Sequence, residues 1–270
     1  MKELLTRTVS GLVFCLILLS CILFSPYSFA SLALLVVAIG SFEMARLQGV
    51  TQPLYIITGV GLVCVAYVVA ALAGLGILDS KWLLVDILIP FLAFLMALFS
   101  TKYSFKQLSA FVLGAFVLLA FPMSLMVWMY CPELFGDLAG AKVIILTFCS
   151  LWVNDVFAYL TGRLLGRHKL FERISPGKTI EGSLGGMIFT LTGILVFSHY
   201  CDWLAFNEAL GIGLIAVVFG TLGDLCESML KRQAGVKDSG KLIPGHGGIL
   251  DRFDSVLFSV PFIFVYLLLL

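Results

Sequence analysis

Nine apolar runs separated by short polar segments constrain the fold of this chain more than any other feature. Most of the runs approach the ~20 residues that a helix needs to cross ~30 Å of hydrocarbon. Within lipid, backbone polar groups must bond to one another inside the segment, so runs of this length are helices. The sequence therefore predicts an all-α, polytopic integral membrane protein with spans at about 8–25, 28–46, 53–75, 82–99, 108–130, 142–162, 183–200, 209–230 and 255–270.

The composition supports a membrane location and disfavours other classes of protein. Hydrophobic residues make up 61% of the 270 residues and charged residues only 12%, whereas about a quarter of a soluble domain is charged. The net charge of +1 provides no basic field for nucleic acid, so no nucleic-acid partner is expected. The seven cysteines form no CxxC pair and are typical of small buried side chains. The first run resembles a signal peptide, but the next run follows at once, which favours an uncleaved span.

The positive charges predict the orientation of the spans. With the N-terminus in the cytoplasm, 15 of the 17 Lys and Arg fall in inner segments, and only Lys81 and Lys142 lie outside. An even number of spans would place one charged loop on the wrong side. We therefore expect nine crossings and a C-terminus outside, the last crossing being only 16 residues long.

The chain divides into two regions of different character. Residues 1–140 form an N-terminal region of about five spans with few polar residues, in which Glu43 and Arg46 are interpreted as a snorkelling pair at a helix end. Residues 141–270 form a C-terminal region of about four spans with polar cytoplasmic loops at 163–182 and 231–250. No internal repeat and no matching pair of broken helices, such as an inverted-repeat transporter would show, is found.

Charged residues concentrate between Gly223 and Ser255, between two apolar runs. Gly220, Asp224, Glu227, Ser228 and Lys231 follow a three-and-four spacing and form one stripe on a helix. After the loop, Asp251, Asp254 and Ser255 share a face at the entrance to the last span. Acids at membrane depth are costly and are functional candidates by default.

Asp224 and Asp251 are candidates for holding a hard cation across this loop. Mg²⁺ takes oxygen ligands, and it usually uses one or two carboxylates while waters and phosphates fill the other positions. The neighbouring Lys and Arg suit those phosphates. The alternative is that acids and bases only pair with one another as a structural network. The glycines of PGHGG either let the backbone approach a ligand or form a hinge, and His246 is an acid, a ligand or a hydrogen bonder that orders the loop.

A second polar segment precedes the seventh run. Ser175-Pro176 indicates a turn, and Lys178 and Glu181 frame a helix start whose free N–H groups suit an anion. Neither a GxSxG elbow nor a P-loop is present. The residues alone thus predict a membrane protein with a cytoplasmic-side site for metal-bound phosphates and do not name the reaction.

The run Ser228–Asp254, SMLKRQAGVKDSGKLIPGHGGILDRFD, resembles the signature of the phosphatidate cytidylyltransferase (CDP-diglyceride synthase) family. The run Asn154–Gly186 is similar to the family's second stretch, except that Gly177 stands where a second lysine is expected. The resemblance is strong over about Trp152–Ser255, and the earlier spans agree only in being hydrophobic. It implies a magnesium-dependent enzyme, with K⁺ as a further cation, that converts CTP and phosphatidate to CDP-diacylglycerol and pyrophosphate.

The resemblance also implies roles for individual residues. Asp224 and Asp251 are the metal-binding acids, and Lys231, His246 and Arg252 complete the catalytic set. The residues expected to bind substrate or phosphates are Lys178, Thr179, Ser228, Arg232, Lys237, Asp238, Gly247 and Gly248, and those expected to support the site are Asn154, Asp155, Glu227 and Asp254.

The chemistry of this reaction agrees with such a set. The lipid phosphate is already ionised at neutral pH, so positioning and charge neutralisation matter more than a general base. The acyl chains can stay in the bilayer of a bacterial inner membrane while CTP arrives from the cytoplasm. A homodimer is expected by analogy. Asp251→Asn is expected to abolish turnover without loss of the folded protein.

Three alternatives are kept. A CTP-dependent polyprenol or phytol kinase would use the same cofactor and nucleotide but needs a base for its hydroxyl acceptor. An ion or phosphate transporter should carry polar residues on both sides of the midplane. An inactive scaffold is disfavoured by the intact acids.

Overall fold

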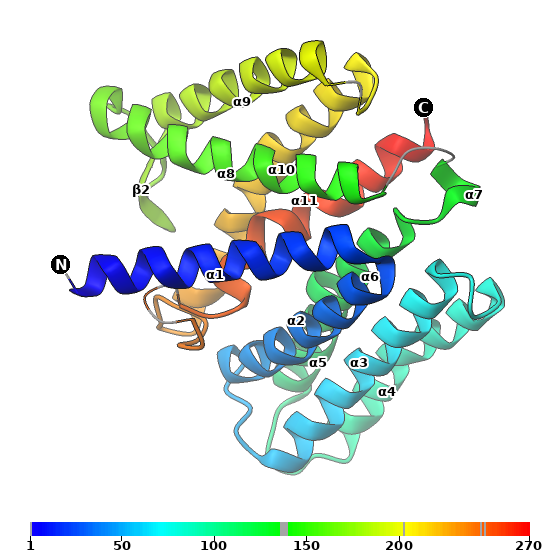
Figure 1. The fold of residues 1–270 in the computed structure, drawn as a ribbon. Coiled ribbons are helices and arrows are strands. Elements are labelled where there is room, and N and C mark those ends of the chain that lie inside the picture. Colours follow the sequence, from blue (N-terminus) through cyan, green and yellow to red (C-terminus); the bar gives the residue numbers. More distant parts are fainter. Residues whose placement is uncertain (1, 136–139, 202, 244, 246) are drawn as a thin grey trace.

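The fold is a bundle of helices with one small hairpin (Figure 1). The computed structural model describes residues 2–135, 140–201, 203–243, 245 and 247–270, with side chains from residue 8 onward. In the described residues the elements are α1 (Lys2–Phe24), α2 (Pro26–Leu47), α3 (Pro53–Gly74), the 3₁₀ helix η1 (Ser80–Ile87), α4 (Leu88–Leu98), α5 (Phe105–Ala115), the π-helical turn η2 (Phe116–Ala120), α6 (Phe121–Trp128), α7 (Pro132–Phe135), α8 (Gly140–Leu165), β1 (Lys169–Phe171), β2 (Ser175–Thr179), α9 (Ile180–Tyr200), α10 (Phe206–Gln233) and α11 (Leu250–Leu268).

Each of the nine predicted spans falls on helical structure. The fourth is composite, with η1 leading into α4, and the fifth runs through α5, η2 and α6. Within the described residues, seven helices are long and apolar enough to cross a membrane, and Thr8–Phe24 is a shorter apolar helix. The chain is therefore a mainly helical membrane protein. The count of nine crossings, the orientation of the ends and the division at residue 140 stay predictions.

The all-α prediction misses a two-stranded antiparallel hairpin. Strands β1 and β2 pair with Lys169 opposite Thr179 and Phe171 opposite Ser175. The helix start expected between Lys178 and Glu181 is confirmed, because Thr179 is the N-cap of α9 and its Oγ1 accepts a hydrogen bond of 3.1 Å from Gly182 N. The hairpin therefore joins α8 directly to α9.

Two groups of helices meet around α1 and α11. In Figure 1, α8, α9 and α10 lie on one side of α1, and α2 to α6 lie on the other. Helix α1 packs against both α2 and α8, while α11 packs against both α10 and α6. The buried core runs through both groups without a break. The C-terminal helix thus has one face against each region of the molecule.

Helices α8 and α9 approach closely through small residues. A Cβ atom at Gly182 would lie 2.7 Å from the Ala158 carbonyl oxygen, and one at Gly186 would lie 2.7 Å from that of Asn154. Small residues at such spacing let two backbones touch inside a membrane, where packing contributes most of the association energy. The hairpin therefore connects two helices that are closely packed against each other.

Aromatic side chains satisfy their polar ends within the N-terminal group. Tyr67 Oη donates to the Ala30 carbonyl at 2.8 Å, and Trp128 Nε1 donates to the Ala70 carbonyl at 2.8 Å. A polar group without a partner is costly in lipid, so these bonds let large rings fill the bundle.

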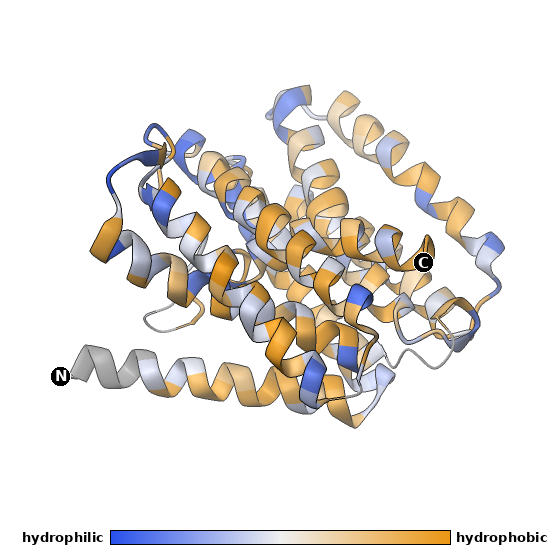
Figure 2. Cartoon of the chain, turned by 90° about the horizontal axis from the view of Figure 1, so that it is seen from above, coloured by the Kyte–Doolittle hydropathy of each residue, from blue (hydrophilic) through white to orange (hydrophobic). Residues whose placement is uncertain are grey.

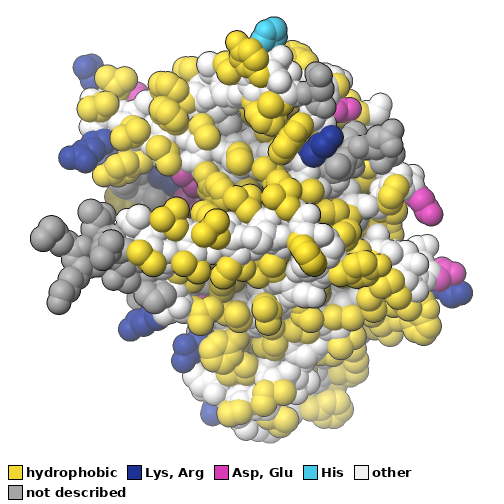
Figure 3. All heavy atoms as spheres, in the orientation of Figure 1, with side chains coloured by type: hydrophobic (Ala, Val, Ile, Leu, Met, Phe, Trp, Pro, Cys, Tyr) yellow, Lys and Arg dark blue, Asp and Glu magenta, His cyan; other side chains and the backbone are white. Residues whose placement is uncertain are grey.

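The surface agrees with a membrane location. Figure 2 shows hydrophilic residues mainly in loops and at helix ends, and hydrophobic residues along the helix middles. Figure 3 shows a face that is mostly hydrophobic, with most of its Lys and Arg toward the edge where Figure 1 marks the N-terminus. Such a distribution matches a bundle that carries its basic residues on one side of a bilayer.

Candidate functional site

Lys231, near the end of α10, holds two carboxylates at once. Its Nζ lies 2.6 Å from Asp251 Oδ1 and also pairs with Glu227 one turn earlier on the same helix. The three side chains are only 11%, 5% and 7% exposed, respectively. Charges at this depth are tolerated only when they are paired, and removing one partner leaves the other uncompensated. Lys231 is therefore the centre of a buried charged cluster.

A second ion pair lies nearer the surface. Lys178 of β2 reaches α10, where its Nζ lies 2.5 Å from Asp224 Oδ2, and the two side chains are 28% and 29% exposed. Ser228 Oγ donates to Asp224 Oδ1 at 3.2 Å. The hairpin and α10 are thus joined by a pair that solvent can reach.

Asp251, in the first turn of α11, organises the preceding segment. Residues 237–249 are called the signature loop below. Asp251 Oδ2 accepts hydrogen bonds from Ser239 N at 3.0 Å, Ser239 Oγ at 3.0 Å and Gly248 N at 2.7 Å. Gly245 and Gly247 adopt φ values of 78° and 84°, a region that glycine enters without strain. The loop is thus closed by a glycine turn and fastened to its own helix.

The same loop is also bound from the other half of the chain. Glu43 of α2 is 4% exposed. Its carboxylate accepts hydrogen bonds from Ser239 Oγ at 2.9 Å, Ile249 N at 3.0 Å and Leu250 N at 2.9 Å. The two carboxylates of Glu43 and Asp251 therefore flank one serine of the signature loop.

Further charges surround the two ion pairs. Asp155 of α8 interacts electrostatically with Lys178, Asp224 and Arg252. Asp254 of α11 interacts with Asp224, Asp155 and Lys231. Acids from three helices and bases from three elements thus form one connected cluster.

The cluster provides oxygen ligands for a cation. Within the described ranges, no three His, Cys, Asp or Glu side chains are arranged to hold a metal ion by themselves. Mg²⁺ does not need such a group, because one or two carboxylates with waters and phosphates suffice. Asp224 fits this use, since it is partly exposed and its hydrogen-bond and ion-pair partners among the described residues are Ser228 and Lys178. Asp251 fits only when its bond to Lys231 opens.

Comparison with known proteins identifies the family. The model of the "Cytidylyltransferase family" matches residues 5–270. The chain belongs to the cytidylyltransferase family.

Three curated relatives of this chain share the same name. A protein of Staphylococcus saprophyticus named "Phosphatidate cytidylyltransferase" is 44% identical over 167 residues, which cover 60% of this chain and 62% of the relative. Proteins of the same name from Staphylococcus aureus and Staphylococcus haemolyticus are 46% and 48% identical over 134 and 130 residues. Each of these two matches covers 48% of this chain and 50% of the relative, so the chain matches about half to three fifths of their lengths.

The structure brings most of the predicted site residues together. The ion pairs and their neighbours contain Lys178, Asp224, Glu227, Ser228, Lys231, Asp251 and Asp254, with Asp155 and Arg252 within electrostatic reach. Arg232 is exposed in the last turn of α10, and Lys237 and Asp238 are exposed at the start of the signature loop. The roles given to these residues stay predictions.

Four predicted residues have structural roles, and a fifth, His246, lies outside the described residues. Thr179 caps α9, and Asn154 is buried where α8 meets α9, where its Oδ1 has no hydrogen-bond partner among the described residues. Gly247 and Gly248 make room for carboxylates, because a Cβ on Gly247 would lie 2.6 Å from Asp251 Oδ2. His246 lies outside the described residues, so its predicted role is untested.

Sequence reasoning missed Glu43, and its pairing with Arg46 is wrong. The Glu43 carboxylate points to the signature loop, whereas the exposed Arg46 guanidinium lies over the Phe42 ring at 4.9 Å from its centroid. The partners of Glu43 are 196 to 207 positions away in the sequence. A basic residue only three positions away already offered a partner for the Glu43 charge, so no distant one was sought. The signal that could have found it is the rule that an acid in an apolar run is a functional candidate.

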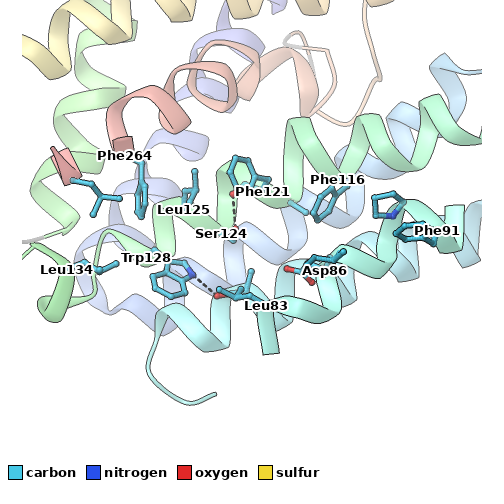
Figure 4. Close-up of a pocket in the computed structure, with 16 residues that line it drawn as sticks. Leu83, Asp86, Phe91, Phe116, Phe121, Ser124, Leu125, Trp128, Leu134 and Phe264 are labelled. Carbon is cyan, nitrogen blue, oxygen red and sulfur yellow. Dashed lines mark hydrogen bonds between the residues drawn. The ribbon is translucent and has the colours of Figure 1, made fainter. Parts of the chain in front are cut away.

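Two cavities among the described residues differ in size and in their relation to the charged cluster. A cavity of about 850 Å³ lies between α3, η1, α4, α6 and α11, and its lining is apolar except for Asp86 and Ser124 (Figure 4). The cavity that touches Glu227 and Asp254 has a volume of only about 30 Å³, enough for one or two waters. The side of the cluster that solvent reaches is the one with Lys178 and Asp224, whose side chains are 28% and 29% exposed.

Proposed function

We propose that this chain is a phosphatidate cytidylyltransferase, which transfers CMP from CTP to phosphatidate and releases pyrophosphate. The observation that carries the proposal is the ion pair between Lys178 and Asp224. This pair joins the hairpin, which lies in the stretch similar to the family's second stretch, to α10, the helix on which the signature run Ser228–Asp254 begins. The name of the curated relatives supports the same reaction.

The chain's own residues suit the approach of two anions. A phosphate oxygen of phosphatidate attacks the α-phosphorus of CTP, and the bond to the bridging oxygen of the β-phosphate breaks. Lys178, Lys231 and Arg252 stabilise the negative charge on the phosphates, and no proton has to be removed from the nucleophile. Asp224 and Asp251 would hold Mg²⁺, with K⁺ as a second cation. When bound, Mg²⁺ neutralises phosphate charge and orients the reacting groups.

When substrate binds, the lysines of the cluster exchange their carboxylate partners for phosphate groups. Each lysine now holds an acid, so each acid becomes available to a cation when its lysine turns to a phosphate. The surface pair of Lys178 and Asp224 is the easier one to open, because both side chains are more than a quarter exposed. The deeper pair of Lys231 and Asp251 opens only with substrate present.

The site would lie at the inner side of a bacterial cell membrane. The acyl chains of phosphatidate stay in the bilayer while CTP approaches from the cytoplasm, where the exposed Arg232 and Lys237 meet it first. The enzyme is proposed to be a homodimer, by analogy with the family.

Transfer of label tests the function. The purified chain in detergent is given phosphatidate and CTP labelled at the α-phosphate, with and without Mg²⁺. The proposal requires label in the lipid fraction and release of pyrophosphate only when Mg²⁺ is present. Failure of the folded protein to transfer label would overturn it. Label from γ-labelled CTP in a polyprenol acceptor would instead identify a lipid kinase.

The alternative of a purely structural network is tested by nucleotide binding. If the ion pairs only hold the fold, CTP with Mg²⁺ should not change the heat of unfolding or the thermal midpoint. If they form the site, ligand binding raises the midpoint in proportion to the logarithm of CTP concentration.

A further inference from the structure

Glu43 lies in a cradle formed by the signature loop and the start of α11. Three hydrogen bonds reach its carboxylate, from Ser239 Oγ, Ile249 N and Leu250 N, at 2.9 to 3.0 Å. Two of these donors are backbone N–H groups at the first turn of α11, which have no partner within the helix. No side chain of its own caps this helix. Glu43 therefore caps α11 from a different helix, and the helix dipole favours its negative charge there.

Two glycines leave the space that the carboxylate fills. A Cβ on Gly248 would lie 2.6 Å from Glu43 Oε2, and a Cβ on Gly240 would lie 2.9 Å from Glu43 Cδ. Neither glycine has a positive φ, so backbone conformation does not require glycine at these positions. The glycines of the signature loop at 240 and 248 thus fit the shape of Glu43.

Ser239 connects Glu43 to Asp251. Its hydroxyl lies 2.9 Å from Glu43 Oε2 and 3.0 Å from Asp251 Oδ2, and one proton can serve only one of them. Asp251 Oδ2 also accepts from Ser239 N and Gly248 N. The Ser239 hydroxyl therefore bridges the two carboxylates and donates to one of them at a time, while backbone N–H groups hold each carboxylate in place.

We propose that Glu43 is a positioning residue for the transfer reaction. It acts through Ser239 and the first turn of α11, and it keeps Asp251 at the place where Lys231 and a cation meet it. The N-terminal half of the chain thereby supplies one fixed point of the site. This inference rests on the proposed function for its effect on turnover, whereas its effect on the loop stands independently.

The test compares Glu43→Gln with Glu133→Gln, the same change at an exposed glutamate of α7. Glutamine keeps the shape but offers one acceptor oxygen, and its amide group faces an N–H donor. Hydrogen exchange of the full chain in detergent should become faster in residues 237–252 and stay unchanged in α8 and α9. We expect kcat to fall about 100-fold, the usual consequence of a shift of ~1 Å at reacting groups. The KM for CTP should change little, and the control should match the unmodified chain.

The outcomes separate the two proposals. Faster exchange of the loop with unchanged kcat would overturn the positioning role, and unchanged exchange would overturn the cradle itself. If the unmodified chain transfers no label, the proposed function fails, but the exchange experiment still decides whether Glu43 holds the loop.

A second variant covers the case in which Glu43→Gln does not fold. Ser239→Ala removes one donor to Glu43 and leaves Ser239 N on Asp251. It should quicken exchange over the same residues and lower kcat about tenfold, the value of one hydrogen bond to a charged group. A variant with normal exchange and normal kcat would count against the proposal.

Discussion

The signature loop and the β1–β2 hairpin flank the same charged cluster but are held in different ways. The signature loop is fastened from beneath by two mostly buried carboxylates, Glu43 from α2 and Asp251 from α11. The hairpin is fastened at the surface, where Glu181 accepts from Arg167 N at 3.1 Å and lies 2.5 Å from His168 Nδ1. The His168 side chain is 75% exposed.

This difference suggests a division of work between the two segments. A loop held by buried charged hydrogen bonds keeps its shape, because leaving such an acceptor without a donor is costly. A hairpin held by exposed pairs moves at little cost. The signature loop is therefore expected to fix the position of Asp251, while the hairpin carries Lys178 toward and away from Asp224.

The largest effect is expected from Asp251→Asn, which removes one of the two carboxylates that hold the signature loop. The sequence alone predicts loss of turnover with an intact fold. The structure adds that this carboxylate also holds Lys231, Ser239 and Gly248. We expect kcat to fall at least about 1000-fold, since both positioning and charge are lost, together with faster hydrogen exchange in the signature loop.

Asp79→Asn, on an exposed acid in the segment between α3 and η1, is the matched control and should retain turnover. An Asp251→Asn protein with normal exchange in the loop would show that the carboxylate serves the chemistry alone.

An intermediate effect is expected from Gly240→Ala. The added Cβ would lie 2.9 Å from Glu43 Cδ, so the loop has to shift. Gly61→Ala is the control, because a Cβ there meets nothing within 4 Å. We expect kcat to fall about 10- to 100-fold for Gly240→Ala and to stay unchanged for the control. Equal activities would show that the loop tolerates displacement.

A smaller effect is expected from Lys178→Gln, which removes the ion pair between the hairpin and α10. Asp224 stays partly solvated after the change, so folding and loop exchange should be unaffected. The KM for CTP should rise about tenfold, because one charged hydrogen bond to phosphate is lost. The KM values for phosphatidate and for CTP are measured separately in the variant and in the unmodified chain. The substrate whose KM rises in the variant is the one that Lys178 contacts. A loss of kcat with unchanged KM would place Lys178 on the reacting groups instead.

The smallest effect is expected from Glu181→Gln. The pair with His168 is exposed, so kcat should change less than about threefold. Limited proteolysis of the hairpin should be faster in this variant, and high salt should produce the same change in the unmodified chain. A large loss of activity would mean that the hairpin is as fixed as the signature loop.

The sequence predicts the helices better than the connections between them. Long apolar runs admit one structure in lipid, so each predicted span falls on a helix. The hairpin was missed because β1 has three residues and β2 contains Ser175-Pro176-Gly177, which shows no strand alternation. Short strands that depend on neighbouring elements show little of the apolar–polar alternation by which strands are recognised in a sequence.

The site was predicted only where its residues share a helix or a motif. The spacing of Asp224 with Ser228 and of Glu227 with Lys231 implies the contacts that are found. Glu43 and the pairing of Lys178 with Asp224 depend on tertiary packing, which no local spacing contains. The N-terminal region therefore looked like inert hydrophobic structure, although its Glu43 binds the signature loop.

The long separation between Glu43 and its donors also bears on how the protein is made. Helix α2 leaves the ribosome well before Ser239, which is 196 residues further along the chain. During that interval its carboxylate has none of the loop donors that satisfy it in the finished protein. Arrival of the signature loop then completes the bundle late in synthesis and joins the newest part of the chain to one of the oldest. A chain that stalls before this step would expose an uncompensated acid within the membrane, a feature by which quality-control proteases could distinguish it from the finished protein.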